Sequence, residues 1–199
     1  MHNRISFFDF DGTITTDDSF IMFIRFVKGN VKLIGGIIVL SPMLIAYKLK
    51  LIPNFKAKEI MFSYFFKSMN KTKFMQVAKE YSLSQIDTIL RPKAMEKIAW
   101  HKEQGDKIVI VSASMECWLK PWCDKNHLEL IATKLEIKED VLTGKFLTKN
   151  CYGIEKVNRI NEIYVLSEYD YIYAYGDSHG DEALLSLANE KFYKPFRNK

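Results

Sequence analysis

Three aspartates stand where predicted strands end, and their spacing could support metal-assisted phosphoryl transfer. Asp9 and Asp11 are two residues apart, so an extended strand would aim both side chains the same way. Together with Asp177 they would crowd three carboxylates around one point, which demands a divalent cation. Oxygen ligands that leave some waters on the ion suit Mg²⁺. Phosphoryl transfer also needs a nucleophile and a group that protonates the leaving oxygen, and the carboxylates could supply both.

Strands and helices are expected to alternate along most of the chain. Apolar, β-rich runs predict strands at residues 4–10, 107–111, 130–135, 171–175 and 191–193. Helical patterns lie between them, at residues 92–105, 153–166 and 181–189. This alternation predicts an α/β fold with a Rossmann-like parallel sheet. Ligands of such sheets bind beyond the carboxyl ends of the strands, so Asp9, Ser112 and Asp177 should converge on one site.

A helical segment separates the first strand from the others. Apolar residues recur at helical spacing at residues 20–28, 55–67 and 72–83. We therefore expect a helical insert at residues 15–88, within a core formed by residues 1–14 and 89–199. Two short β-rich runs, 135–138 and 141–146, are typical of a hairpin joined across Glu139 and Asp140.

Four sequence motifs occur in order along the chain. DFDGT at residues 9–13 and IVIVSAS, which ends at residues 112–114, are followed by GIEKV around Lys156 and GDSHGD at residues 176–181. Each piece alone could be an ordinary turn or helix cap, but all four together resemble the haloacid dehalogenase superfamily of phosphatases, subfamily IB, which includes phosphoserine phosphatases. The resemblance implies a phosphoric monoester hydrolase whose helical cap is inserted between the first and second motifs.

The resemblance also implies catalytic roles. Asp9 would attack phosphorus and form an aspartyl-phosphate, while Asp11 would protonate the leaving group and later activate water. Ser112 and Lys156 would hold the phosphate oxygens. True dehalogenases of the superfamily lack the second aspartate, so Asp11 argues against dehalogenation.

A magnesium site and a substrate site are implied in the same way. Mg²⁺ would be ligated by Asp9, Asp177 and the backbone carbonyl of Asp11. Asp181 would act from further out, through a bound water or by orienting Lys156. The expected substrate-binding residues are Gly12, Thr13, Asp18, Ala113 and Ser114.

Asp18 has two interpretations of about equal weight. It lies nine positions after Asp9, where phosphoserine phosphatases carry an acid that reads the amino group of the substrate. It could equally cap the helix expected at residues 20–28.

The insert is basic and contains a long uncharged run. Residues 19–58 hold seven basic residues and no acidic one, and residues 33–47 are fifteen uncharged residues in a row. As a helix this run would reach only about 22 Å, against roughly 30 Å of membrane hydrocarbon. It is therefore expected to be a buried cap helix or an interfacial segment on anionic lipid, with the buried helix slightly favoured.

The substrate class stays open between two alternatives. The apolar insert, SAS and GIEKV look like the subgroup that contains bacterial phosphatidylglycerophosphate phosphatases, which implies a phospholipid phosphate. A small soluble phosphomonoester such as phosphoserine is the alternative. A low-turnover module that binds lipid or protein on this scaffold is a third interpretation, and nucleic-acid binding ranks last because no recognition motif accompanies the basic residues.

Composition points to a reducing compartment. The three cysteines form no C-x-x-C pair and suggest neither a disulfide framework nor a zinc site. The amino terminus lacks the pattern of a secretion signal. We expect a cytoplasmic protein, with peripheral contact at the inner face of the membrane as the alternative.

Overall fold

The centre of the protein is a five-stranded sheet with the strand order β3-β2-β1-β6-β7. The computed structural model describes residues 3–197, so the outermost residues of the predicted core, 1–2 and 198–199, lie outside the described residues. The strands are β1 (Arg4–Phe8), β2 (Lys107–Met115), β3 (Glu129–Thr133), β6 (Tyr171–Gly176) and β7 (Glu190–Tyr193). All neighbouring strands run parallel. The predicted α/β fold with a parallel sheet is confirmed.

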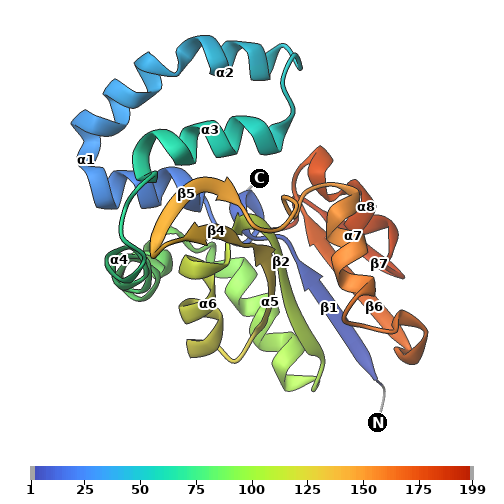
Figure 1. Ribbon diagram of the computed structural model, residues 1–199. Coiled ribbons are helices and arrows are strands. Elements are labelled where there is room, and N and C mark those ends of the chain that lie inside the picture. The colour runs from blue at the N-terminus through green and yellow to red at the C-terminus, as the bar shows by residue number, and fades with distance from the viewer. Residues whose placement is uncertain (1–2, 198–199) are drawn as a thin grey trace.

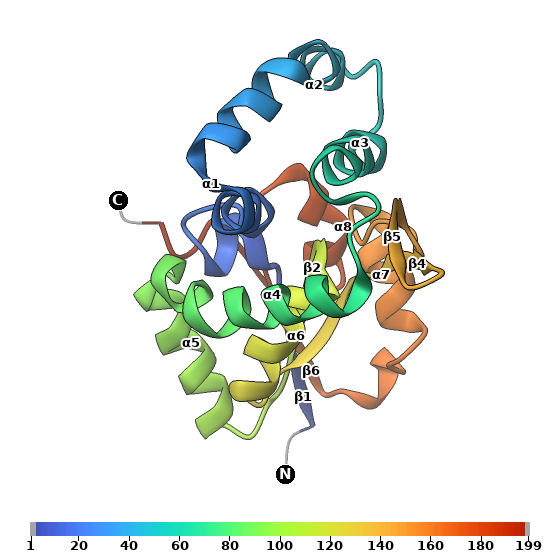
Figure 2. The ribbon, with the colours of Figure 1, turned by 60° about the vertical axis from the view of Figure 1, so that its left-hand side comes forward.

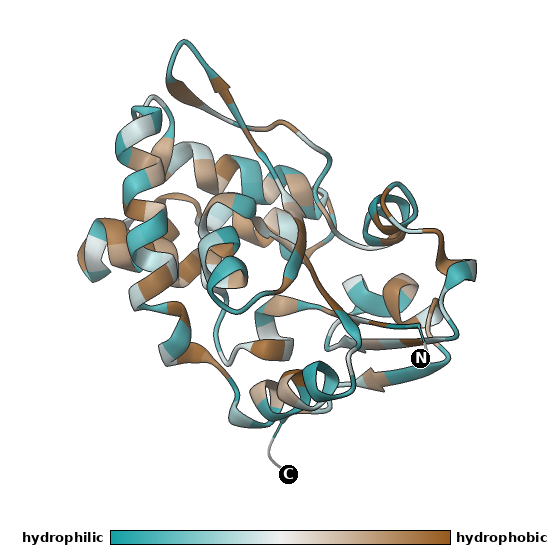
Figure 3. Ribbon diagram, turned by 90° about the horizontal axis from the view of Figure 1, so that it is seen from below, coloured by the Kyte–Doolittle hydropathy of each residue, from teal (hydrophilic) through white to brown (hydrophobic). Residues whose placement is uncertain are grey.

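Helices cover both faces of this sheet (Figure 1). They are α5 (Pro92–Glu103) and α6 (Glu116–Lys125) on one face, and α7 (Ile154–Asn161) and α8 (Glu182–Ser186) on the other. Successive side chains of a strand point to opposite faces, so Phe8 packs with α5 and α6 while Phe7 packs with α7 and α8. In the hydropathy view, hydrophobic residues recur along both strands and helices (Figure 3). Burial on both faces explains the uninterrupted apolar runs of the strands.

Three helices of the insert lie beyond the carboxyl ends of the strands, and a fourth lies beside the core (Figure 1; Figure 2). The four are α1 (Ser19–Val39), α2 (Ser41–Lys48), α3 (Asn54–Phe66) and α4 (Lys71–Ser84). Helix α4 packs against α6, where the backbone N–H of Trp122 donates to Ser82 Oγ at 3.0 Å. The insert is therefore anchored to the side of the core by its last helix.

The predicted hairpin is present and belongs to the layer above the strands. Strands β4 (Leu135–Lys138) and β5 (Val141–Phe146) pair antiparallel, and β5 packs against α3. The backbone N–H of Phe146 donates to Glu59 Oε1 at 3.0 Å, and that of Ser68 donates to the Leu142 carbonyl at 2.8 Å. Residues far apart in sequence thus complete one layer.

Several predicted boundaries were wrong. The end of the helix expected at residues 20–28 is close to correct, since Gly29 (φ 78°, ψ 167°) interrupts α1 there and glycine adopts this conformation without strain, but a further helical stretch follows as far as Val39. The strand expected at residues 107–111 continues to Met115, since Ser112 and Met115 still pair with β3. The helix expected at residues 153–166 ends at Asn161, and short 3₁₀ turns form at Ile86–Ile89, Leu166–Glu168 and His179–Asp181.

Helices α1 and α2 carry the uncharged run. Within residues 3–197, no helix taken alone has both the length and the apolar character needed to cross a membrane. The α1–α2 pair would qualify by length and composition, but the two helices are bent by 63°.

Candidate active site

Asp9 lies at the end of β1, beneath the helical layer. Its backbone N–H donates to the carbonyl of Tyr175 on β6 at 2.9 Å, which continues the sheet pairing past the end of the strand. Its side chain is only 10% exposed. Oδ1 accepts a hydrogen bond from Lys156 Nζ at 2.6 Å, and Oδ2 accepts one from Thr13 Oγ1 at 3.0 Å. Both carboxylate oxygens are therefore held by donors in a dry environment.

Lys156 joins two buried carboxylates. Its Nζ lies 2.7 Å from Asp181 Oδ1 as well as 2.6 Å from Asp9 Oδ1, and the side chain is fully buried. Burial alone would lower the pKa of this amine, but Asp9 and Asp181 more than offset it and raise the pKa of Lys156 above its ordinary value. For Asp181 burial acts to raise the pKa, and the charge of Lys156 and its hydrogen bonds bring it below the usual value. Lys156 is thus a fixed cation.

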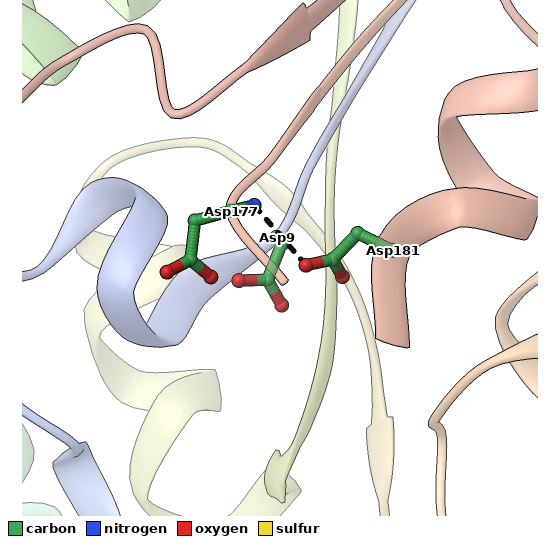
Figure 4. A group of neighbouring side chains, drawn as sticks. All are labelled: Asp9, Asp177 and Asp181. Atoms are coloured by element: carbon green, nitrogen blue, oxygen red, sulfur yellow. Dashed lines mark hydrogen bonds between the residues drawn. The ribbon is translucent and has the colours of Figure 1, made fainter. Parts of the chain in front are cut away.

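Asp9, Asp177 and Asp181 form an acidic cluster at the ends of β1 and β6 (Figure 4). One carboxylate oxygen from each lies within 4.8 Å of the others. Burial raises the pKa of Asp9 to about 7, with a smaller opposing effect from Lys156, and burial also raises the pKa of Asp177. Clustered carboxylate oxygens are the hard donors that a divalent cation such as Mg²⁺ prefers, so Asp9 and Asp177, with Asp181 beside them, fit such an ion.

The two outer aspartates of the cluster are bound differently. Asp181 Oδ2 accepts from the backbone N–H groups of Asp177 and Ser178 at 3.1 and 3.0 Å and from the Ser178 hydroxyl at 2.7 Å. Asp177 Oδ2 pairs with an Arg197 guanidinium nitrogen at 2.5 Å. Asp181 is therefore hydrogen-bonded to the loop after β6 and to Lys156. Asp177 instead forms an ion pair with Arg197 of the carboxyl-terminal segment.

Gly12 makes the approach of the two loops geometrically feasible. It lies in the turn Phe10–Ile14 with φ 82°, and a Cβ atom added there would lie 2.6 Å from Asp177 Oδ2. A side chain would be both strained and in collision with the carboxylate. Glycine at this position thus keeps Asp177 next to the turn that follows Asp9.

The side chain of Asp11 lies outside the acidic cluster. Oδ1 accepts from the backbone N–H of Ser19 at 2.7 Å, and Oδ2 accepts from Ser114 Oγ at 2.5 Å. Burial and then the charge of Asp18 raise the pKa of Asp11, while Lys58 and Ser114 act in the opposite direction. Ligation of a metal ion through the backbone carbonyl of Asp11 stays a prediction. The side chain of Asp11 is bound instead to Ser19 and Ser114.

The second motif, residues 112–114, lies near the carboxyl end of β2 and contacts Asp11 through Ser114. Ser112 Oγ accepts from the backbone N–H of Ser114 at 3.0 Å, and both serines are buried. Ser114 Oγ in turn accepts from Ser19 Oγ at 3.0 Å. The Ala113 carbonyl accepts from Lys58 Nζ at 3.4 Å. The predicted convergence of the ends of β1, β2 and β6 is therefore present.

Asp18 caps α1. Its Oδ1 accepts from the backbone N–H groups of Phe20 and Ile21 at 2.9 and 3.0 Å, which satisfies two of the free donors at the start of the helix. The helix-cap interpretation is confirmed by this geometry. Its carboxylate also lies close enough to Asp11 to raise the pKa of that residue.

The comparison of sequences decides the family. A model of haloacid dehalogenase-like hydrolase matches residues 6–186. This chain belongs to that family. Membership confirms the prediction of a hydrolase, and the match spans all four motifs of this family member.

Individual relatives agree with the family. Protein CicA of Caulobacter vibrioides is 32% identical over 194 residues, which cover 96% of this chain and 86% of CicA. A solved protein of unknown function from Bordetella pertussis Tohama I has a TM-score of 0.82 at 20% identity, covering 96% of this chain and 89% of that one. A phosphoserine phosphatase solved as a phospho-aspartyl intermediate analogue has a TM-score of 0.61 at 19% identity, covering 96% and 86%. These solved structures show that this hydrolase shares their fold.

Sequence reasoning did not assign three of the residues that contact the site. Ser19 contacts Asp11 and Ser114, Lys58 reaches the Ala113 carbonyl from α3, and Arg197 pairs with Asp177. The acid-free stretch at residues 19–58 was the available signal for Lys58. Nothing in the local sequence of this hydrolase marks Arg197.

Proposed function

We propose that this protein is a Mg²⁺-dependent phosphomonoester phosphatase that acts through an aspartyl-phosphate on Asp9. The observation that carries the proposal is the buried Asp9 carboxylate, held by Lys156 and Thr13 inside a cluster with Asp177 and Asp181. A carboxylate oriented in this way can act as a nucleophile. A nearby fixed cation offsets its repulsion from an anionic phosphate.

Two displacements at phosphorus complete the reaction. Asp9 attacks phosphorus, an acyl-phosphate bond forms, and the ester P–O bond breaks while Asp11 gives its proton to the leaving oxygen. Asp11 then takes a proton from water as that water attacks phosphorus, which breaks the acyl-phosphate bond and restores Asp9. Burial raises the pKa of Asp11 above its ordinary value, which is the direction that a general acid needs.

The remaining residues bind and orient. Asp9, Asp177 and the backbone carbonyl of Asp11 would hold Mg²⁺, which when bound supplies positive charge opposite the phosphate oxygens. Asp181 keeps Lys156 in place, because its own oxygens are fully used by Lys156 and by the loop after β6. The proposed phosphate-contacting residues are Ser112 and Lys156, assisted by Gly12, Thr13, Ala113 and Ser114.

The layer above the strands is proposed as a cap over this site. It comprises α1 to α3 from the insert at residues 15–88, completed by the hairpin β4–β5. Lys58 on α3 connects this layer with the second motif, since its Nζ donates to the Ala113 carbonyl. Its charge also acts to lower the pKa of Asp11, against the larger opposite effect of burial.

A phospholipid phosphate is the substrate class that the cap favours. A groove of about 690 Å³ opens between α3 and the segment that leads into α7, with Phe55, Phe146, Leu147 and Tyr152 among its lining residues. The lining also includes Glu59, Lys149 and Glu155, so the groove combines apolar surface for an acyl chain with charged side chains at its walls. A small soluble ester such as phosphoserine is the second candidate, favoured by the position of Asp18, although that carboxylate already caps α1.

Turnover and covalent trapping test the chemistry. Purified protein should release phosphate with Mg²⁺ and not with EDTA, and acid quenching should trap labelled phosphate on Asp9. Asp9→Asn should abolish both while the circular dichroism spectrum is unchanged, and Asp87→Asn, at an exposed ion pair with Lys125, should behave as wild type. Mg²⁺-dependent turnover retained by Asp9→Asn would refute the nucleophile, and no turnover by wild type on any ester would favour the binding-module alternative.

The substrate class is decided by competition. The kcat/KM for phosphatidylglycerophosphate in mixed micelles should exceed that for phosphoserine and a panel of soluble esters. The reverse order would identify a soluble phosphomonoesterase.

A further inference from the structure

Residues 31–51, which we call the apolar arm, expose an unusual amount of hydrophobic surface. The arm contains the end of α1, the whole of α2 and the start of the following loop. Nine of the eighteen exposed large hydrophobic side chains found among the described residues lie within it: Val31, Ile34, Ile37, Ile38, Val39, Ile45, Tyr47, Leu49 and Leu51. Single exposed hydrophobic residues are ordinary, but a contiguous group of this size marks an interaction surface.

The end of α1 is apolar on two opposite faces. Leu33 and Gly36 face α3, where a Cβ atom added to Gly36 would lie 2.2 Å from the Phe65 ring. Ile34 and Ile38, one helical turn apart, are 57% and 66% exposed. A helix on the surface of a water-soluble protein normally presents polar residues on its outer face. The outer face of α1 therefore has the composition of a surface that meets an apolar medium.

Lysines flank the arm at both ends. Lys28 lies before the arm and Lys32 at its start, Lys48 ends α2 and Lys50 lies in the turn that follows. No acidic residue occurs between residues 19 and 58. Lys32, Lys48 and Lys50 are exposed. Cations around an exposed apolar face complement an anionic lipid surface, where each basic side chain strengthens binding.

We propose that the apolar arm docks into the headgroup region of an anionic lipid bilayer, with the end of α1 and α2 lying along the membrane surface. The two helices are bent by 63° relative to each other, and neither helix taken alone has both the length and the apolar character needed to cross a bilayer. A second copy of this chain is a poorer occupant. A two-fold contact through the arm would bring the same lysines together with no acid in the arm to pair with them.

The arm is on the same side of the molecule as the carboxyl ends of the strands (Figure 1). Docking would therefore present the site to the membrane face. The proposal does not depend on the phosphatase activity, because binding to vesicles is measured without turnover.

Vesicle flotation tests the proposal. Full-length protein is mixed with vesicles of phosphatidylcholine alone, or of phosphatidylcholine with phosphatidylglycerol, and the floating fraction is measured. We expect flotation with the anionic vesicles and a loss of roughly tenfold or more for the double variant Ile34→Asp/Ile38→Asp. Lys48→Glu/Lys50→Glu should lower the affinity by at least roughly fivefold per lysine and remove the preference for phosphatidylglycerol.

Matched variants separate docking from misfolding and from catalysis. Ile163 and Val165, after α7, are 59% and 60% exposed, so Ile163→Asp/Val165→Asp carries the same chemical change outside the arm and should float as wild type. Asp9→Asn should also float as wild type while losing turnover, so the two proposals fail independently. Circular dichroism checks each fold. The proposal would be overturned if the wild type did not float, or if Ile34→Asp/Ile38→Asp and Ile163→Asp/Val165→Asp lost flotation equally. It would also be overturned by a wild-type dimer in light scattering that Ile34→Asp/Ile38→Asp dissociates.

Discussion

Replacing Lys156 with methionine should destabilise the protein more than the loss of an ordinary ion pair. Its ammonium lies 2.6 Å from Asp9 and 2.7 Å from Asp181, and all three side chains are buried. Methionine keeps the length of the side chain and removes its charge, which leaves two buried carboxylates without their common partner. Breaking a buried ion pair costs about 3–5 kcal/mol. For a chain of this size that corresponds to a fall in Tm of roughly 6–20 °C.

The measurement is thermal unfolding followed by circular dichroism in EDTA, so that bound metal does not contribute. Lys125→Met is the matched control, because Lys125 pairs with Asp87 at 2.7 Å while both side chains are about half exposed. Exposed pairs contribute about 0–1 kcal/mol. Adding Asp181→Asn to Lys156→Met should recover part of the lost stability, since one unpaired charge is then removed. A Tm for Lys156→Met that matches the Lys125→Met control would refute the buried-triad argument.

Three further predictions concern other parts of the molecule. Asp11→Asn should slow hydrolysis least for p-nitrophenyl phosphate, whose leaving group needs no proton, and equal slowing for alkyl esters would contradict the acid role. Gly36→Ala should destabilise by about 1–3 kcal/mol in urea titrations because its Cβ meets Phe65, whereas Gly35→Ala, with nothing within 4 Å, should stabilise by about 0.5–1 kcal/mol. Burial holds the pKa of His101 below its ordinary 6.5, so the unfolded chain binds the proton more readily. The contribution of His101 to stability should be constant above about pH 6.5 and decrease as pH falls from 6.5 towards the folded pKa, where it levels off. His101→Asn should remove this part of the pH dependence.

The sheet could be predicted because its information is local. Each central strand is a short run of apolar residues buried on both faces, and the polar residue that follows marks its carboxyl end. The parallel arrangement then follows from alternation with helices, which is why the ends of β1, β2 and β6 were expected to meet. The continuation of β2 to Met115 was missed, because it depends on pairing with β3 rather than on composition.

The contents of the helical layer were harder to predict. The hairpin β4–β5 was expected, but its packing on α3 depends on contacts such as that between Phe146 and Glu59, which are 87 residues apart. Lys58 was counted only as one of the seven basic residues of the insert, since only the tertiary placement of α3 brings it to the Ala113 carbonyl. Local sequence singled out Asp9 and its immediate hydrogen-bond partners as candidates, whereas the residues that the insert contributes required the structure.

Helix α1 runs from the site to the apolar arm. Its break at Gly29 separates the part that contacts the site from the part that leads into the arm. The first part is fixed to the core, because Ser19 donates its backbone N–H to Asp11 at 2.7 Å and its carbonyl accepts from the Tyr81 hydroxyl at 3.0 Å. Beyond Gly29 the helix rests on α3 through Gly36, and α3 is the helix that carries Lys58 to the site. The arm therefore contacts the site region in two ways, along α1 to Ser19 and across to the helix that carries Lys58.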